Sequence, residues 1–166
     1  MAIRSILVYP HPTLVKTDNA DVVFGDPSLG QIIEDMNDTL DASPGVALAA
    51  PQIGYSINMI IVDVNRDKNI KNRDGQGRVI LLNPKITKES EPHRVREGCL
   101  SVPEFTGNVI RYRKIIVEGY QPDGAYLTIE SQGFESIAFQ HEVDHLKGTI
   151  FLDRVRSRRK DLFRRK

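Results

Sequence analysis

The residues best able to do chemistry in this chain form the run His141-Glu142-Val143-Asp144-His145. Residues four apart on a helix lie on one face, so both imidazoles of this H-E-x-x-H pattern can reach one metal ion. Three apolar residues precede the histidines on the same helical stripe, Phe134, Ile137 and Ala138, which predicts that both rings face inward. Because buried imidazoles need polar partners, the sequence predicts a site for one divalent metal ion.

A catalytic metal site of this kind has three protein ligands and an open position for water. The third ligand could be another histidine, a carboxylate or a thiolate. His11 and His93 lie near prolines in predicted loops, whereas Cys99 lies in a Gly-containing strand end and is the only cysteine of the chain. A thiolate is the softest ligand available here. We therefore expect Cys99, His141 and His145 to bind the ion.

Two further side chains suit roles in hydrolysis at such an ion. Glu142 has a free carboxylate beside the predicted ligands and could move protons between water and a leaving amine. Gln52 follows the small-residue run 45–51, which lets a substrate backbone approach, and its amide could donate to a developing oxyanion. Asp144 is expected to orient a ligand histidine or to pair with an arginine such as Arg111.

The elements that must position these residues predict an α+β fold. Apolar spacing predicts a helix from an N-cap at Asp26 to near Ser43, and a second helix over residues 134–148. Strands are predicted over residues 57–64, 79–87, 114–121, 126–131 and 149–153, with Pro84 at a bulge or edge and a hairpin turn at 122–124. We expect one catalytic domain, residues 1–153, followed by a basic tail, residues 154–166, that is not a separate domain.

Charge and cysteine content indicate where the protein works. Of its 23 basic side chains, eight lie in residues 154–166, which contain one of the 22 acidic side chains. Such a segment attracts polyanions, although it could equally be a solvated helix end. The single cysteine excludes an internal disulfide and favours a reducing cytoplasm. No apolar run is long enough to span a membrane, and the first residues lack the pattern of a signal peptide.

Three segments together resemble the peptide deformylase family. These are GVALAAPQ at 45–52, EGCLS at 97–101 and QHEVDH at 140–145, in an order and spacing that fit the family along nearly the whole chain. The resemblance implies small antiparallel or mixed sheets around a central H-E-x-x-H helix, with an N-terminal amphipathic helix. It also implies removal of the formyl group from formylmethionine at the start of new polypeptides, with release of formate.

The resemblance assigns further roles to residues of this chain. Cys99, His141 and His145 would hold the ion, which is expected to be Fe²⁺, with Zn²⁺ or Ni²⁺ as alternatives in the purified protein. Glu142 would be the general acid and base, and the oxyanion would be held by the Gln52 side chain and the Leu100 backbone N–H. The substrate is expected to contact Gly45, Val46, Ala47, Gly98, Ile137 and Ala138, with an apolar pocket for methionine at Val46, Ile137 and Ala138.

The charge distribution and the family resemblance together predict the binding partners. We expect N-formylmethionyl peptides as substrates and docking on the ribosome through residues 154–166, without a membrane and without sequence-specific nucleic-acid binding. The family's first motif usually has glycine where this chain has Ala47, which keeps open a weakened or altered deformylase that acts mainly as a peptide-binding or ribosome-binding module. H-E-x-x-H also occurs in zinc peptidases, so a small metallopeptidase is the other alternative.

Overall fold

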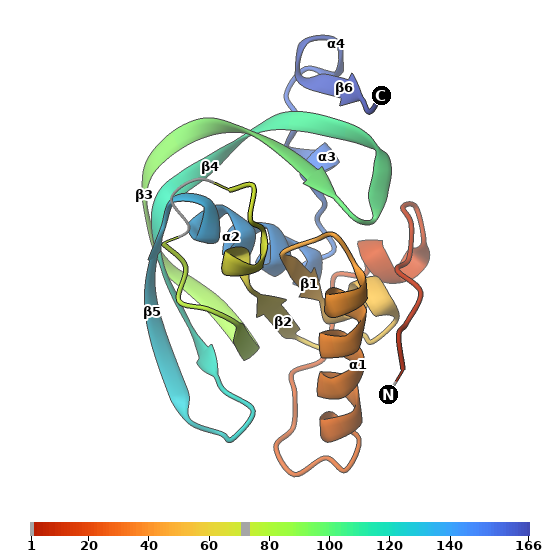
Figure 1. The fold of residues 1–166 in the computed structure, drawn as a ribbon, viewed down its shortest axis with the longest axis vertical. Helices are drawn as coiled ribbons and strands as arrows, with labels where there is room; N and C mark the ends of the chain where they lie inside the picture. The colour runs from red at the N-terminus through yellow and green to blue at the C-terminus, as the bar shows by residue number, and fades with distance from the viewer. Residues whose placement is uncertain (1, 71–73) are drawn as a thin grey trace.

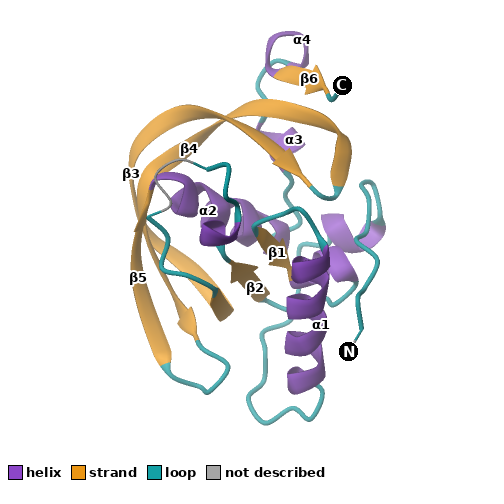
Figure 2. Cartoon of the chain, viewed as in Figure 1, coloured by secondary structure: helices purple, strands orange, loops and turns teal. Residues whose placement is uncertain are grey.

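The computed structural model describes residues 2–70 and 74–166. In chain order, its elements are η1 (Pro12–Val15), α1 (Leu29–Ala42), β1 (Ala47–Ala49), η2 (Ala50–Ile53), β2 (Met59–Val62), η3 (Val64–Arg66), β3 (Val79–Cys99), β4 (Val102–Tyr120), β5 (Tyr126–Gln132), α2 (Gly133–Leu146), α3 (Phe151–Arg154), α4 (Arg158–Asp161) and β6 (Leu162–Arg164). The arrangement confirms the predicted α+β class, with α2 enclosed by strands (Figures 1 and 2).

One six-stranded sheet connects these strands within the described residues, in the order β1-β2-β3-β4-β5, with β6 added alongside β4. Each pairing between these strands is antiparallel. The longest part is the β3–β4 ribbon, which arches over α2 in Figure 1. Its register shifts between Leu82 and Lys85, between Ile86 and Lys88, and between Gly98 and Cys99. Such bulges bend a ribbon, and the first of them lies at Pro84 as predicted.

The sheet's first strands are buried on both faces, which explains why β1 and β2 are continuously apolar. One face packs against α2, and the other packs against α1. Successive strand side chains point to opposite faces, so Ile60 and Val62 lie with Phe139 and Val143 of α2. The intervening residues of β2 belong to the other core, together with α1 residues Ile32, Met36 and Leu40.

Helix α1 is the expected amphipathic helix, and it ends at Ala42 with Ser43 as its C-cap. It begins later than predicted. The N-cap is Ser28 rather than Asp26, and the Asp26 carboxylate accepts hydrogen bonds from the backbone N–H and hydroxyl of Ser28. Asp26 therefore stabilises the turn that precedes the helix.

Three predicted strands need correction. The strand predicted over residues 114–121 begins much earlier, at Val102, as β4. The strand predicted to end at residue 87 continues to Cys99, because the polar residues 88–99 pair with β4. Residues 151–153 of the strand predicted over 149–153 instead belong to helix α3, and the Asp153 carboxylate accepts a hydrogen bond from the backbone N–H of the N-cap Ile150. Phe151 fills a third core cluster from this helix. Across residues 2–70 and 74–166, no helix has both the length and the apolar character needed to cross a membrane.

Candidate metal centre and active site

The three predicted metal ligands come together at the centre of the molecule. Helix α2 places His141 and His145 one turn apart, with ring centroids 5.0 Å from each other. Cys99 is the last residue of β3, and its Sγ lies 3.3 Å from Nε2 of His145. The ligand atoms of the three residues all lie within 4.8 Å of one another. This buried thiol and imidazole set fits a divalent ion that accepts nitrogen and sulfur ligands.

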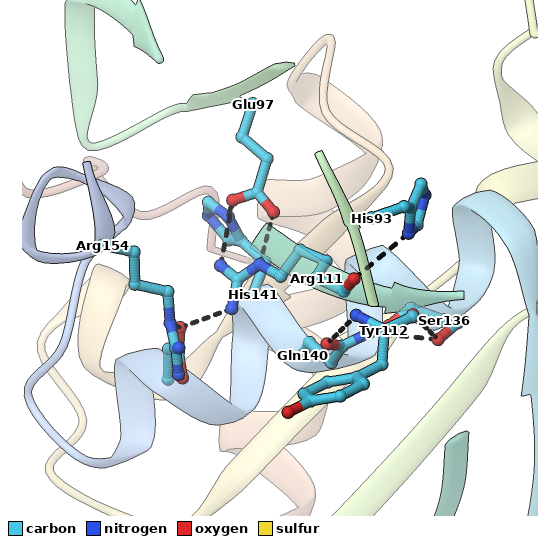
Figure 3. A network of polar contacts seen from close by, with 9 residues as sticks. His93, Glu97, Arg111, Tyr112, Ser136, Gln140, His141 and Arg154 are labelled. Carbon is cyan, nitrogen blue, oxygen red and sulfur yellow. Dashed lines mark hydrogen bonds and ion pairs between the residues drawn. The ribbon is translucent and has the colours of Figure 1, made fainter. Parts of the chain in front are cut away.

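Glu97 fixes the orientation of one ligand ring. Its Oε2 lies 3.0 Å from Nδ1 of His141, which leaves Nε2 of that ring to face the ligand cluster. Arg111 holds the same carboxylate by two hydrogen bonds, from Nε at 2.6 Å and from Nη2 at 2.9 Å (Figure 3). A carboxylate behind a ligand histidine fixes the ring's tautomer and raises its basicity. Glu97 therefore belongs to the site, although no separate role was predicted for it from the sequence.

The Glu97 carboxylate stays ionised despite its burial. Burial alone would raise its pKa, but the hydrogen bonds and charges of His141 and Arg111 outweigh that effect and lower the pKa to about 2. The same partnership raises the pKa of Arg111 against the opposing effect of burial. Both side chains are nearly inaccessible to solvent. The Glu97 carboxylate of this ion pair therefore places a negative charge next to His141.

Arg111 also connects this pair to Asp144 of helix α2. Its Nη1 donates to Asp144 at 2.7 Å, so the predicted pairing of Asp144 with Arg111 is confirmed. Arg154 donates to the same carboxylate from Nε and Nη2. Gln140 adds a second connection, because its carboxamide accepts from the backbone N–H of Tyr112 and donates to the Tyr112 carbonyl. These contacts fix the rotation of α2 relative to β4, and therefore the direction of the histidines (Figure 3).

Glu142 lies in the same buried region as the ligands. The residue as a whole is 4% exposed, and its Oε2 has no hydrogen-bond partner among the described residues. Burial raises the pKa of this carboxyl to about 7, while the nearby charge of His141 lowers it. A carboxyl that titrates near neutral pH suits a group that must both accept and donate a proton. A bound cation would shift this pKa downward.

Gln52 directs its amide nitrogen toward Cys99. The side-chain oxygen accepts from the backbone N–H of Ala49 at 2.8 Å. The Nε2 group lies 3.2 Å from the hydroxyl of Ser101 and 3.7 Å from Sγ of Cys99. Ser101 also directs its backbone N–H to Sγ at 3.4 Å. The predicted oxyanion donor Leu100 lies between Cys99 and Ser101, in the turn that joins β3 to β4.

A cavity of about 630 Å³ opens next to this cluster. Eleven of the twelve residues predicted for the site line it: Gly45, Val46, Ala47, Gln52, Gly98, Cys99, Leu100, Ile137, Ala138, His141 and Glu142. The twelfth, His145, lies deeper and is 1% exposed. The cavity is also lined by residues that the sequence did not indicate, among them Val95, Arg96, Phe134 and Arg165.

The substitution at Ala47 causes no backbone strain. Ala47 pairs with Val62 in β1, and the non-glycine residues with positive φ are Asn83 and Glu91 within the described chain. The tighter position is Gly45, where a Cβ would lie 2.8 Å from Cδ1 of Leu100, so that this side chain would have to shift. The methyl group of Ala47 therefore fits this backbone, and its presence gives no reason to expect an inactive protein.

A helix-borne H-E-x-x-H pair that meets a cysteine beside a cavity defines this protein as a metal-dependent hydrolase. A sequence-family model described as Polypeptide deformylase matches residues 3–161. The chain is 39% identical over 166 residues to a peptide deformylase from Syntrophobacter fumaroxidans, covering 100% of this chain and 94% of that protein. It therefore belongs to the peptide deformylase family, whose members remove the N-formyl group from new polypeptides.

Solved structures agree with this assignment. A peptide deformylase from Thermotoga maritima superposes with a TM-score of 0.83 at 34% identity, covering 95% of this chain and 100% of that chain. A class I type b peptide deformylase from Acinetobacter baumannii, in a Met-Ala-Ser-bound crystal structure, has a TM-score of 0.86 at 30% identity over 93% and 99% of the two chains. Neither the metallopeptidase nor the non-catalytic module is favoured by these relatives.

Proposed function

We propose that Cys99, His141 and His145 hold the metal ion for deformylation and that Glu142 transfers the protons. The observation that carries this assignment is the convergence of three ligand atoms within 4.8 Å beside a cavity that Glu142 also lines. A divalent ion held there would polarise the formyl carbonyl and acidify water. Glu142 would accept a proton from the attacking water and deliver it to the departing α-amino nitrogen of methionine.

The oxyanion is assigned to two donors of this chain. The Nε2 group of Gln52 already points toward Cys99, and the Leu100 backbone N–H belongs to the next residue. Both would donate to the formyl oxygen as negative charge develops there. Because Ala49 N–H and Ser101 hold the Gln52 amide at both ends, its donor needs no reorganisation during the reaction. The products are formate and a peptide with a free amino terminus.

The methionine side chain is assigned to the apolar part of the cavity. Val46, Ile137 and Ala138 line it, and Phe134 and Val95 extend the apolar surface. The peptide beyond methionine is expected to add along β1, because β1 is an edge strand of the sheet. Among the described strands it pairs with β2 alone, which leaves its other side for a peptide. Gly45, Ala47 and Gly98 would then contact the substrate backbone. The Met-Ala-Ser bound to the Acinetobacter baumannii relative supports peptides of this class.

Replacing Glu142 with glutamine tests the proton-transfer role. We expect turnover of formyl-Met-Ala-Ser to fall by about 10²–10⁴-fold, while the metal content stays that of the wild type. Glu130→Gln, an exposed carboxylate on β5, is the matched control. Unchanged turnover in Glu142→Gln would refute the role. In the same assay, formyl-Met-Ala should react faster than formyl-Asp-Ala, and unformylated Met-Ala-Ser should remain intact.

The ion is proposed to be Fe²⁺, on the basis of the family resemblance. The Cys/His/His donor set also accepts Zn²⁺ and Ni²⁺, and Zn²⁺ normally binds such ligands more tightly than Fe²⁺. Which metal ion the protein contains therefore depends on the ions supplied to it as well as on its ligands. Protein purified without oxygen should contain mainly iron by elemental analysis. Zinc at one equivalent in protein prepared anaerobically from iron-replete cells would contradict the assignment.

Docking on the ribosome in the cytoplasm is proposed for the basic segment 154–166. Arg154 of this segment already binds Asp144, so it is not counted among the charges available to the ribosome. Asp161 of the segment pairs with Arg94, which lies outside it. Truncation would also remove β6 from the sheet, so substitution is the cleaner test. Changing Arg156, Arg158 and Arg159 to glutamine should weaken co-sedimentation with ribosomes at low salt. Lys85, Lys88 and Lys147 changed likewise are the control, and equal binding by both variants would contradict the proposal.

A further inference from the structure

The C-terminal segment returns to the cavity and forms part of its wall. Strand β6 pairs with β4 through Leu162 with Gly107, Phe163 with Thr106 and Arg164 with Phe105. Arg165 follows β6, and its backbone N–H donates to the carbonyl of Glu104 at 2.8 Å. The side chain of Arg165 then lines the same cavity as Cys99 and His141.

Side chains as well as backbone hold this strand in place. The Arg96 guanidinium lies 3.6 Å from the ring centroid of Phe163, and Leu162 packs against the core cluster that contains Phe151. Arg164 lies over the ring of Phe105 at 5.5 Å. Cation–π contacts and apolar burial both oppose detachment of the strand. Arg165 is therefore positioned by the fold rather than carried on a free tail.

The guanidinium of Arg165 occupies the space above Gly98. A Cβ built on Gly98 would lie 2.1 Å from Nη2 and 3.3 Å from Cζ of Arg165. Neighbouring strand residues point to opposite faces, so Glu97 and Cys99 are buried while Gly98 and Arg165 face solvent. Arg165 therefore lies at the mouth of the cavity, on the outer side of the strand that ends in the metal ligand.

No acidic side chain pairs with Arg165 within residues 2–70 and 74–166. The acids of the cavity are otherwise engaged or buried. Glu97 binds Arg111 and His141, Asp67 accepts from the backbone of Asn69, and Glu142 lies inside. The other arginine of the cavity, Arg96, covers the Phe163 ring. Arg165 thus offers a guanidinium at the cavity mouth whose hydrogen-bond donors are available to a ligand.

We propose that Arg165 binds a carboxylate of the substrate peptide, beyond the formylmethionine residue. The formyl group and the methionine side chain enter the buried part of the cavity, so the group that reaches the mouth belongs to the following residues. A guanidinium fits a carboxylate through two parallel hydrogen bonds. That carboxylate is either an acidic side chain or the C-terminus of a short peptide. This inference rests on the proposed function, because it assumes that peptide enters this cavity.

Paired peptides distinguish the two sources of the carboxylate. The first pair is formyl-Met-Ala-Glu-amide and formyl-Met-Ala-Gln-amide, and the second is formyl-Met-Ala-Ala with a free or an amidated C-terminus. For each pair we would measure kcat/KM, and also Kd of the deformylated products by calorimetry, which requires no turnover. We expect the wild type at low salt to prefer the acidic member of at least one pair by about two- to five-fold in both quantities, as for an exposed ion pair.

Two variants decide whether Arg165 is responsible. Arg165→Ala should abolish the preference and leave kcat/KM for the neutral amide unchanged within two-fold, whereas Arg159→Ala removes an equal charge from the same segment and should retain the preference. A preference that survives Arg165→Ala, or is absent in the wild type, would overturn the inference. So would an equal loss on acidic and neutral peptides, which indicates a structural role. If the wild type does not turn over the neutral amide, the proposed active site itself is in error. The ratio of product Kd values within each peptide pair still decides the role of Arg165 in that case.

Discussion

Replacing Glu97 with glutamine would test how the buried ion pair supports the metal centre. The Glu97 carboxylate accepts three hydrogen bonds, two from Arg111 and one from His141. All three partner atoms are donors when His141 carries its proton on Nδ1. Glutamine keeps the shape of the side chain but changes one oxygen into an NH₂ group, which must then face a donor in either orientation.

The size of the effect follows from these contacts. The less costly orientation places the NH₂ group opposite Nε of Arg111, which loses one charge-assisted hydrogen bond and leaves the guanidinium with Asp144 as its remaining anionic partner. Buried hydrogen bonds to charged groups contribute about 1.5–3 kcal/mol each. We therefore expect the metal-free protein to lose about 1.5–3 kcal/mol of unfolding free energy. Loss of the negative charge behind His141 should also weaken metal binding by about 10–100-fold.

Two measurements separate these effects. Urea unfolding of the metal-free protein reports the stability, and competition with a chelator at pH 7.5 reports the affinity for Zn²⁺. Glu89→Gln, an exposed carboxylate on the same strand, is the control and should change neither quantity. Wild-type Zn²⁺ affinity in Glu97→Gln would refute the idea that Glu97 tunes His141. Wild-type stability of the metal-free variant would refute the assigned contribution of the buried ion pair.

Three other changes test separate parts of the structure. Gly148→Ala should lower the unfolding free energy by about 1–3 kcal/mol in urea, because Gly148 has φ +70° and a Cβ there would lie 2.7 Å from the carbonyl oxygens of Val15 and Lys16. Gly124→Ala, with φ +89° and open space, should cost less. Asp35→Asn should be less stable than the wild type above about pH 4, and this difference in unfolding free energy should shrink toward pH 2. Hydrogen bonds from Tyr55 and Arg4 outweigh burial and hold the Asp35 pKa at about 2, so the contribution of the carboxylate is lost as the pH falls. A constant difference across this range would exclude the ionised form as the cause. Gln52→Leu should reduce kcat by about 10²–10³-fold without loss of bound metal, and a change confined to KM would exclude the oxyanion role.

Local pattern explains which elements the sequence predicted well. The body of α1 was predicted from its apolar spacing and its end from Pro44, because both signals are contained in consecutive residues. The hairpin at 122–124 was predicted from its turn residues for the same reason. In contrast, residues 88–99 of β3 are polar, and their strand conformation depends on pairing with β4. The run TIFLD at 149–153 was predicted as a strand, but capping by Asp153 and burial of Phe151 favour a helix there.

The sequence by itself indicated the chemistry of the site, since the types and spacing of His141, Glu142 and His145 favour a metal-assisted reaction. Its resemblance to a family then supplied the substrate. Only the tertiary structure decided how those groups are oriented. Arg111 reaches Glu97 across the β3–β4 ribbon, and Arg165 reaches Gly98 from the end of the chain. Contacts between residues far apart in the chain depend on strand register and helix rotation, which are set by packing of the whole core and leave no short-range pattern in the sequence.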